Sequence, residues 1–256
     1  MQAYDVLTTT VRRGLTVDEI EFALPDQQPS TGYLVRQYPG VVRRAVLALH
    51  DERTDKAALL PELMALGALG FVAMSVDCPA SRDAMRQRDA LGATRTMHAA
   101  GQRALALLGD EPDVGPHRMA IVGHGLGGEI AGSLAEATSG VRTVVAVSPL
   151  LHRGRFVRDA DHPLAAGARL HLGDTAVDAQ ADGLIAFDLG EHMHETRERH
   201  WLVQLADDDD RYTAEDRREF SFGVPASARV SDYPTRVSLH APAGLHERVS
   251  FLDAMT

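Results

Sequence analysis

The chain has 256 residues, enough to bury the core of one large α/β domain, and no Pro/Gly/Ser-rich linker divides it, so we expect a single domain over residues 1–256. Its net charge of −10 disfavours nucleic acid and anionic membranes as partners. The single cysteine, Cys78, excludes an intramolecular disulfide. The N-terminal residues show no apolar signal-type segment and no apolar run could span a bilayer, so we expect a cytoplasmic location.

Strand-like and helix-like segments alternate along the chain, which is typical of a mostly parallel sheet covered by helices. Residues 16–25 and 32–38 are predicted to form a leading pair of strands. Short apolar runs predict further strands at residues 43–50, 71–79, 117–123 and 141–149. Apolar residues at helical spacing, small residues and closing glycines predict helices at residues 55–70, 82–110 and 125–138.

The second half of the chain begins with a segment of poor periodicity, residues 150–200. We interpret this segment as an irregular, lid-like insertion that contains one helix. Regular patterns return with a strand at residues 201–210 that ends in four aspartates. The remaining predictions are a helix at residues 213–223, a short strand at residues 236–240 and a final helix at residues 245–255.

The most informative stretch is AIVGHGLGGEIAG, residues 120–132, where a predicted strand runs directly into a predicted helix. A strand, a tight turn with flanking glycines and a helix form the context of a G-x-S-x-G nucleophile elbow. Gly125 stands at the position of the nucleophile, and glycine has no side chain with which to attack. A generic strand–turn–helix is the alternative, and a dinucleotide-binding fingerprint fits worse because the glycine spacing differs from G-x-G-x-x-G.

With this motif and this order of elements, the chain from residue 43 to the C-terminus resembles the α/β-hydrolase family, most closely the dienelactone-hydrolase and small-esterase type. The resemblance implies an α/β-hydrolase fold, with a mostly parallel central sheet flanked by helices. The family pattern has Ser, or less often Cys or Asp, where this chain has Gly125. The chain is therefore expected to be an atypical member in its chemistry and an ordinary one in its fold.

The resemblance also implies an acid and a histidine in that order along the chain. Asp209 and Asp210, which follow a late strand, are both candidates for the acid, although a solvated acidic turn is an alternative. His240 is the preferred histidine and His246 is its rival. Both histidines also have a noncatalytic interpretation.

An oxyanion hole needs backbone donors, and the resemblance implies the N–H of Leu126 as one of them. The second donor is expected near Asp51, in the loop that follows His50. The family usually has glycines in this loop, whereas this chain has Asp51-Glu52-Arg53, and acidic side chains beside a developing oxyanion are unfavourable unless they point away.

Other residues near the predicted carboxyl ends of strands are also candidates for the site. His124 of the elbow and Ser148 are expected substrate-binding positions, since ligands bind at this edge of open α/β sheets. Ser148 and Cys78 are also weighed as substitute nucleophiles, but most such residues only cap a turn or fill space.

Two further clusters lie within residues 150–200. Arg153, Arg155 and Arg158 are candidates for gripping a carboxylate or phosphate, or form a surface cluster with local acids. His192 and His194 would share a face on a strand but diverge on a helix, which the pattern favours. We therefore expect no metal, and nothing indicates a cofactor.

Three functions are compatible with these features. The first is an atypical enzyme of the kind found in secondary metabolism. It would perform epimerase, isomerase or cyclase chemistry on a small-molecule or peptide-like carbonyl compound. The second is an ester, thioester or lactone hydrolase whose serine has been replaced by Gly125, naturally or by construction. The third is a pseudoenzyme that binds a ligand. The sequence indicates neither the substrate nor an oligomeric state.

Overall fold

A computed structural model of the chain describes residues 3–25, 28–37, 43–78, 83–84, 89–159, 161–162, 165 and 174–256. Within these residues, nine strands form one mixed sheet in the order β1-β2-β3-β5-β4-β6-β7-β8-β9. The pairs β1–β2, β2–β3 and β3–β5 are antiparallel, and all pairs from β4–β5 onwards are parallel. The strands are β1 (Asp5–Arg12), β2 (Leu15–Ala23), β3 (Pro29–Gln37), β4 (Arg43–Leu49), β5 (Val72–Asp77), β6 (Val114–His124), β7 (Val141–Val147), β8 (His200–Ala206) and β9 (Ala228–Tyr233).

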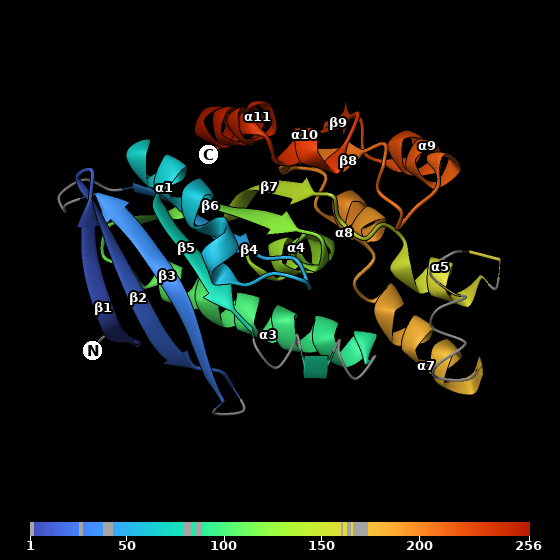
Figure 1. The fold of residues 1–256 in the computed structure, drawn as a ribbon, viewed down its shortest axis with the longest axis horizontal. Coiled ribbons are helices and arrows are strands. Elements are labelled where there is room, and N and C mark those ends of the chain that lie inside the picture. The colour runs from blue at the N-terminus through green and yellow to red at the C-terminus, as the bar shows by residue number, and fades with distance from the viewer. Residues whose placement is uncertain are drawn as a thin grey trace.

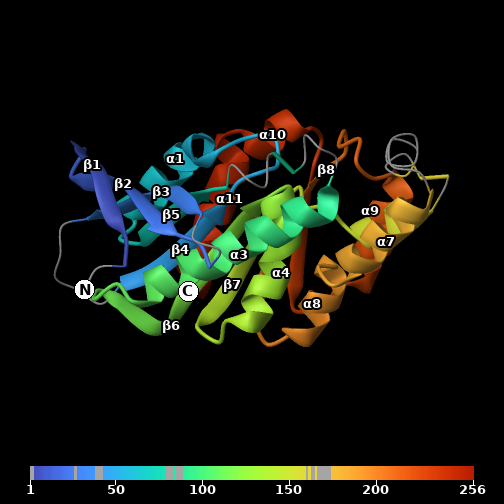
Figure 2. The same ribbon diagram turned by 90° about the horizontal axis from the view of Figure 1, so that it is seen from below.

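Helices cover both faces of the sheet (Figures 1 and 2). Helices α1 (Leu60–Ala68), which the short 3₁₀ helix η1 (Lys56–Leu59) precedes, and α11 (Pro242–Met255) contribute to the apolar core on one face. Helices α3 (Ala90–Gly109), α4 (Leu126–Ala137) and α8 (Leu189–Glu195) contribute to the core on the other. Because helices cover both of its faces, a central strand such as β4 is a nearly continuous apolar run, buried over its last five residues.

The strands and helices predicted between residues 43 and 149 are present. The predicted helix at 82–110 is described as α3 from Ala90 onwards, whereas residues 82 and 85–88 lie outside the described residues. Positions 38 and 79, at the ends of two predicted strands, also lie outside them. The helix predicted at 213–223 is observed as α9 (Ala214–Gly223).

Two edge strands were not expected. Every residue of β1 is exposed, and β9 is only partly buried, so neither carries the hydrophobic alternation that reveals a half-buried strand. The prediction of a strand at 236–240 is wrong, because these residues form the short helix α10 (Arg236–His240). A capping box between Thr235 and Ser238, in which each side chain accepts a hydrogen bond from the other residue's backbone N–H, starts this helix.

The segment at 150–200 is more regular than its sequence indicates. Its described residues contain three helices, α5 (Arg153–Arg158), α7 (Asp174–Ile185) and α8, whereas residues 160, 163–164 and 166–173 are not described. Helix α5 packs on α7, α7 packs on α3, and α8 packs on α4. These helices therefore extend the layer that covers the sheet (Figure 2).

The parallel strands bring four chemistry-bearing segments to one edge of the sheet. β4 is followed by Asp51 and Glu52, β6 ends at His124 before Gly125, β7 is followed by Ser148, and β8 by Asp209. The carboxyl ends of neighbouring parallel strands lie on the same side of a sheet, which is where ligands bind in open α/β folds. No described helix is both long and apolar enough to cross a membrane.

Candidate active site

The turn between β6 and α4 has the tight geometry that the sequence predicts. Gly125 has φ of 53° and ψ of −115°, a conformation that L side chains rarely adopt. A Cβ on Gly127 would lie 2.6 Å from the Cβ of Leu49, and one on Gly123 would overlap the carbonyl of Gly127. These two glycines therefore let α4 approach β4 and β6 closely, as a nucleophile elbow requires.

Two carboxyl groups fill the space around Gly125. A Cβ built on Gly125 would overlap the carboxylate of Asp51 and lie 3.1 Å from Oε2 of Glu52. The backbone N–H of Leu126, the expected oxyanion donor, donates to Oε2 of Glu52 at 3.3 Å. The acidic side chains therefore point into the elbow, and they occupy both the place of a nucleophile and that of an oxyanion.

The two carboxyl groups share a hydrogen bond and differ in their affinity for a proton. Burial alone would raise the pKa of Asp51, but the hydrogen bond with Glu52 and the charge of Arg211 lower it. Burial, together with the hydrogen bond and the charge of Asp51, raises the pKa of Glu52. The pKa values of the two carboxyl groups are therefore shifted apart, and Asp51 is the one that ionises more readily.

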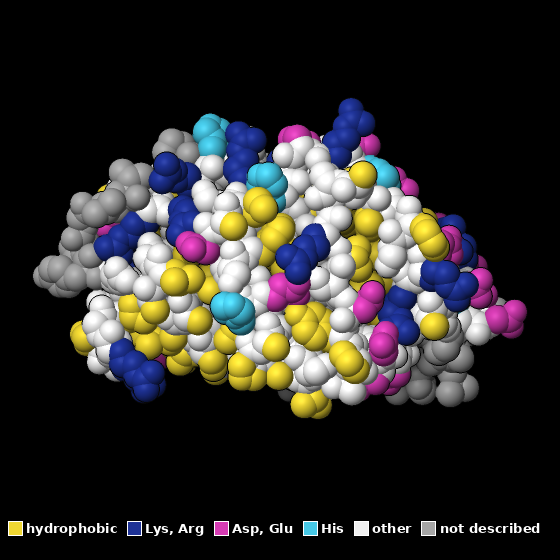
Figure 3. Space-filling view, turned by 90° about the horizontal axis from the view of Figure 1, so that it is seen from above, with side chains coloured by type: hydrophobic (Ala, Val, Ile, Leu, Met, Phe, Trp, Pro, Cys, Tyr) yellow, Lys and Arg dark blue, Asp and Glu magenta, His cyan; other side chains and the backbone are white. Residues whose placement is uncertain are grey.

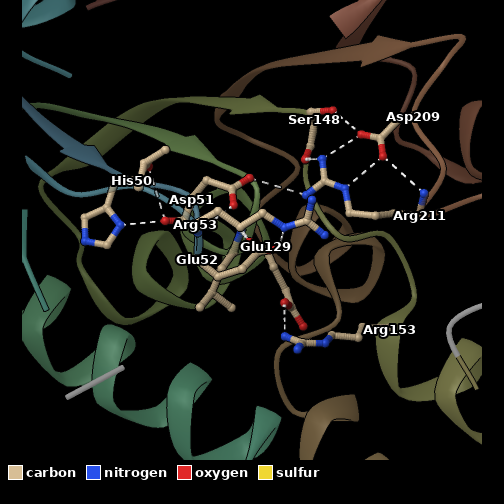
Figure 4. Close-up of polar contacts among 11 residues, drawn as sticks. His50, Asp51, Glu52, Arg53, Glu129, Ser148, Arg153, Asp209 and Arg211 are labelled. Carbon is tan, nitrogen blue, oxygen red and sulfur yellow. Dashed lines mark hydrogen bonds and ion pairs between the residues drawn. The ribbon is translucent and has the colours of Figure 1, made fainter. Parts of the chain in front are cut away.

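Asp209, the candidate acid, is committed to other partners (Figure 4). Its buried carboxylate accepts hydrogen bonds from Nε of Arg211 at 2.8 Å and from Nη2 at 2.6 Å, and a short one from the hydroxyl of Ser148. Burial would raise the pKa of Asp209, but the hydrogen bonds and the charge of Arg211 hold it far below its usual range. Because two hydrogen bonds from the guanidinium of Arg211 engage this carboxylate, it does not serve as the base that would activate Ser148 as a nucleophile.

Arg211 links this cluster to the carboxyl pair. Its Nη2 donates to the carbonyl of Ser148 at 2.8 Å, and its Nη1 lies 3.5 Å from Oδ2 of Asp51. Asp210, the other candidate acid, is exposed. Neither aspartate has a hydrogen bond to His240 in the described part of the chain. The predicted pairing of acid and histidine is thus not formed.

A carboxylate does hold another imidazole of the site, that of His124. Its Nε2 lies 2.8 Å from Oε2 of Glu62, which comes from α1, and Oε1 of Glu62 accepts from Nε of Arg248 at 2.7 Å. All three side chains are buried. Burial alone would raise the pKa of Glu62, but the charges of His124 and Arg248 lower it to about 2. Glu62 is therefore ionised at neutral pH and orients the ring of His124.

His240 lies beside this group. Its ring stacks on that of His124, with centroids 5.6 Å apart and an interplanar angle of 19°. Partial burial and the charges of His124, Arg248 and Arg236 lower the pKa of His240, so that its imidazole is neutral at neutral pH. His246, the rival histidine, is exposed on α11 and does not line the same cavity.

A cavity of about 390 Å³ opens at this edge of the sheet. Its walls bring together most of the groups described above, and no described residue of the 150–200 segment lines it. The groups of this cavity that carry chemistry are Asp51, Arg53, Glu62, His124, Ser148, Arg236, His240 and Arg248.

The remaining candidates have structural roles. His50 is buried, and its Nδ1 lies 2.7 Å from the carbonyl of Asp51, which fixes the start of that loop. Cys78 is buried in the core and does not line the cavity. His192 and His194 lie on α8 and contact Glu136 and the carbonyl of Gly223 respectively. Among the described residues, no three His, Cys, Asp or Glu side chains gather as metal ligands.

Sequence reasoning did not find four of the groups that shape the site: Glu62, Arg211, Arg236 and Arg248. Arg248 and Glu62 are 186 positions apart and meet only because α11 and α1 pack on the same face of the sheet. Glu129 was also missed. It is buried on α4, its Oε2 accepts from Nη1 of Arg153 at 3.0 Å, and burial raises its pKa to about 7.

The comparisons with known proteins concern the fold. No protein-family model matches the chain, and no curated protein matches it by sequence. An acetyl xylan esterase from Paenibacillus sp. R4 superposes with a TM-score of 0.74 over 99% of this chain and 88% of its own, at 15% identity. A cold-adapted esterase from an Arctic intertidal metagenomic library, in a polyethylene glycol complex, has a TM-score of 0.71 over 97% of each chain, at 15% identity. A 2,6-dihydroxy-pseudo-oxynicotine hydrolase has a TM-score of 0.68 over 93% of this chain and 68% of its own, at 13% identity.

These similarities and the strand order show that the chain has the α/β-hydrolase fold, as its sequence predicts. The structural neighbours are esterases and other hydrolases. At such low identities the likeness extends to the fold, and the chemistry of this chain has to be argued from its own residues.

Proposed function

We propose that this protein is an enzyme that transfers protons on a small carbonyl compound, as an epimerase or isomerase does, without a covalent intermediate. The observation that carries the proposal is the carboxylate of Asp51, which faces the cavity from the place that a nucleophile on Gly125 would take. A glycine cannot attack the substrate, but an ionised carboxylate can accept a proton.

The carboxyl pair suits proton abstraction next to a carbonyl group. Asp51 takes the proton from the carbon beside the carbonyl, and the electron pair of that C–H bond moves towards the carbonyl oxygen to give an enolate. Delivery of a proton to the opposite face of that carbon, with the proton on Asp51 released to solvent, completes an epimerisation, and transfer of the proton to another atom of the enolate completes an isomerisation. Neither sequence consumes a co-reactant or leaves an atom on the protein.

Glu52 supports Asp51 through the hydrogen bond that their two carboxyl groups share. Its bond to the N–H of Leu126 keeps its carboxyl group in place, and its raised pKa makes it the member of the pair that binds a proton more tightly. The opposite shifts of the two pKa values favour Asp51 as the ionised member of the pair before the reaction.

The two histidines supply the other groups that proton transfer needs. A neutral imidazole has one N–H donor, so His240 can polarise the carbonyl oxygen while Asp51 removes the proton. Glu62 engages Nε2 of His124, so Nδ1 is the ring nitrogen that can exchange a proton with the substrate. Asp51, His240 and His124 all line the same cavity.

The test is hydrogen exchange in D₂O, followed by proton NMR on a panel of ketones, keto acids and esters that have a hydrogen next to the carbonyl group. We expect catalysed exchange for at least one compound, and a loss of about 100-fold in Asp51→Asn. Asp232→Asn is the matched control, since Asp232 is an exposed aspartate on β9 that does not line the cavity.

Equal exchange in Asp51→Asn and in the unaltered protein would overturn the proposal, as would the absence of exchange in every compound that binds. Hydrolysis of the esters, lost in Asp51→Asn, would overturn it in favour of a hydrolase in which Asp51 activates water. Binding without any conversion would leave a ligand-binding protein.

A further inference from the structure

The charged groups of the cavity are not all neutralised by one another. Glu62 is shared by His124 and Arg248, and Asp51 is paired with Arg211 and accepts from the backbone N–H of Arg53 at 3.1 Å. The acidic groups that line the cavity are therefore each matched by a cation.

Two cationic side chains of the same cavity are in excess. Arg236 begins α10, and only its backbone N–H has a hydrogen bond, to Asp208; within the described residues its guanidinium has no hydrogen bond or ion pair. The side chain of Arg53 is 66% exposed, and its Nε lies 4.0 Å from Oε1 of Glu52. At this distance, and with the Arg53 side chain largely in solvent, the contact is a weak ion pair that leaves the guanidinium available to an anion.

The charge of Arg236 affects the pKa of two groups of the cavity, His240 and Asp51. It contributes to the low pKa of His240, after burial and the charges of His124 and Arg248, and it also acts on Asp51. The guanidinium of Arg236 therefore lies in range of the two groups to which the proton-transfer chemistry is assigned. Figure 3 shows the face of the molecule on the side of α10 and α11, where Lys and Arg (dark blue) and His (cyan) lie beside hydrophobic side chains.

We infer that the substrate of this site carries an anionic group, a carboxylate or a phosphate, which Arg236 binds together with Arg53 at the opening of the cavity. The inference rests on the proposed function in that it names the substrate class of the same site. A guanidinium presents a planar fork of N–H donors that matches the oxygens of either anion.

The arrangement of charges also sets the orientation of the substrate. The carboxylate of Asp51 repels an anion, so the anionic group lies at Arg236 and the uncharged carbonyl end lies at Asp51 and His240. A cavity of about 390 Å³ holds a small molecule of this kind and is near the lower end of the usual range for ligand sites.

The three arginines that the sequence offered for this task are already paired. Arg153 binds Glu129, Arg155 binds Glu219 and Arg158 binds Asp182, and none of them lines the cavity. The role of gripping a carboxylate or phosphate, the less favoured of the two interpretations of these arginines, is therefore assigned to Arg236 instead, which sequence reasoning did not single out.

The test uses inorganic phosphate and pyruvate, a small keto acid, as probes, with acetone as the uncharged analogue. Each is titrated into the ¹⁵N-labelled full chain at constant ionic strength while the amide signal of Gly125 is followed. We expect pyruvate or phosphate, or both, to shift this signal with saturation, and acetone to bind at least 10-fold more weakly. Saturation by phosphate alone would assign the anion to a phosphate, and by pyruvate alone to a carboxylate.

The variants separate this inference from the proposed function. Arg236→Gln is expected to weaken anion binding at least 10-fold, Arg236→Lys to weaken it less, and Arg218→Gln, which removes an exposed arginine of α9, to leave it unchanged. Asp51→Asn should retain or strengthen anion binding while hydrogen exchange is lost. Anion binding that survives Arg236→Gln, or equal binding of acetone and pyruvate, would overturn the inference. Failure of hydrogen exchange with anion binding intact would overturn only the proposed function.

Discussion

The carboxylate of Asp51 lies where a side chain on Gly125 would begin. The two residues follow neighbouring parallel strands, β4 and β6, and their contact makes the glycine part of a carboxyl site. Gly125 is therefore required by two features at once, its positive φ and the acidic side chain beside it.

The first prediction concerns Gly125→Ser. We expect this variant to gain no hydrolysis of p-nitrophenyl esters, because the new Cβ collides with Asp51 and Glu52 holds the oxyanion donor of Leu126. Removing the obstructing carboxylate in Asp51→Gly/Gly125→Ser should give more ester hydrolysis than Gly125→Ser alone. Full esterase turnover in the single variant would contradict the geometry.

The same variant should be less stable than a matched control. Gly70 has φ of 89° and open space where a Cβ would lie, so Gly70→Ser measures the cost of a positive φ alone, about 1–2 kcal/mol. Gly125→Ser should cost more in urea unfolding because the collision is added to that strain. Equal costs would show that Asp51 moves aside freely.

The second prediction is a pH dependence that arises from Glu62. Its pKa in the folded protein is about 2, below the ordinary 4.5, so its ionised form stabilises the fold above pH 4.5 and this contribution is lost as the pH falls towards 2. The shift corresponds to a contribution on the order of 3 kcal/mol at neutral pH. Glu62→Gln should therefore be less stable than the unaltered protein at pH 7. The difference between their free energies of unfolding, measured in urea, should become smaller at lower pH. Glu195→Gln, an exposed change on α8, should show no such narrowing.

The third prediction has the opposite sign and concerns Glu129. Burial raises its pKa to about 7, so the protonated carboxyl stabilises the fold below pH 4.5 and this contribution is lost as the pH rises through 7. Glu129→Gln, which remains uncharged, should gain stability relative to the unaltered protein between pH 5 and pH 8. Thermal unfolding across this range measures the difference, and a constant difference would contradict the buried, protonated state.

The fourth prediction concerns the buried pair of Arg211 and Asp209. Arg211→Met leaves the carboxylate of Asp209 buried without its cation, and we expect a loss of about 3–5 kcal/mol in the free energy of unfolding. Asp209→Asn/Arg211→Met should lose less than the sum of the two single changes, because neither partner is then left as an isolated charge. Additive losses would mean that the two side chains do not depend on each other.

The order of the central strands and helices was predictable because each of them has a local sequence pattern. The central strands β4, β6 and β7 each contain a short apolar run, and the elbow is contiguous in sequence, so both were visible without the fold. β1 and β9 were not, because an edge strand is defined by the neighbour to which it bonds, and its own side chains can be polar. The helix at 236–240 was missed because its capping residues, and not its apolar spacing, start it.

The features of the site can be separated in the same way, into those set by local sequence and those set by the packing of distant segments. The sequence by itself determined that a tight, glycine-containing turn without a nucleophile lies between β6 and α4, since steric demands on a turn are local. Only the tertiary structure decided which acid meets which base: Asp209 binds Arg211 two positions away, while His124 binds Glu62 across 62 positions. Electrostatic pairing depends on distance in space, and the packing of α1 and α11 against one face of the sheet sets those distances.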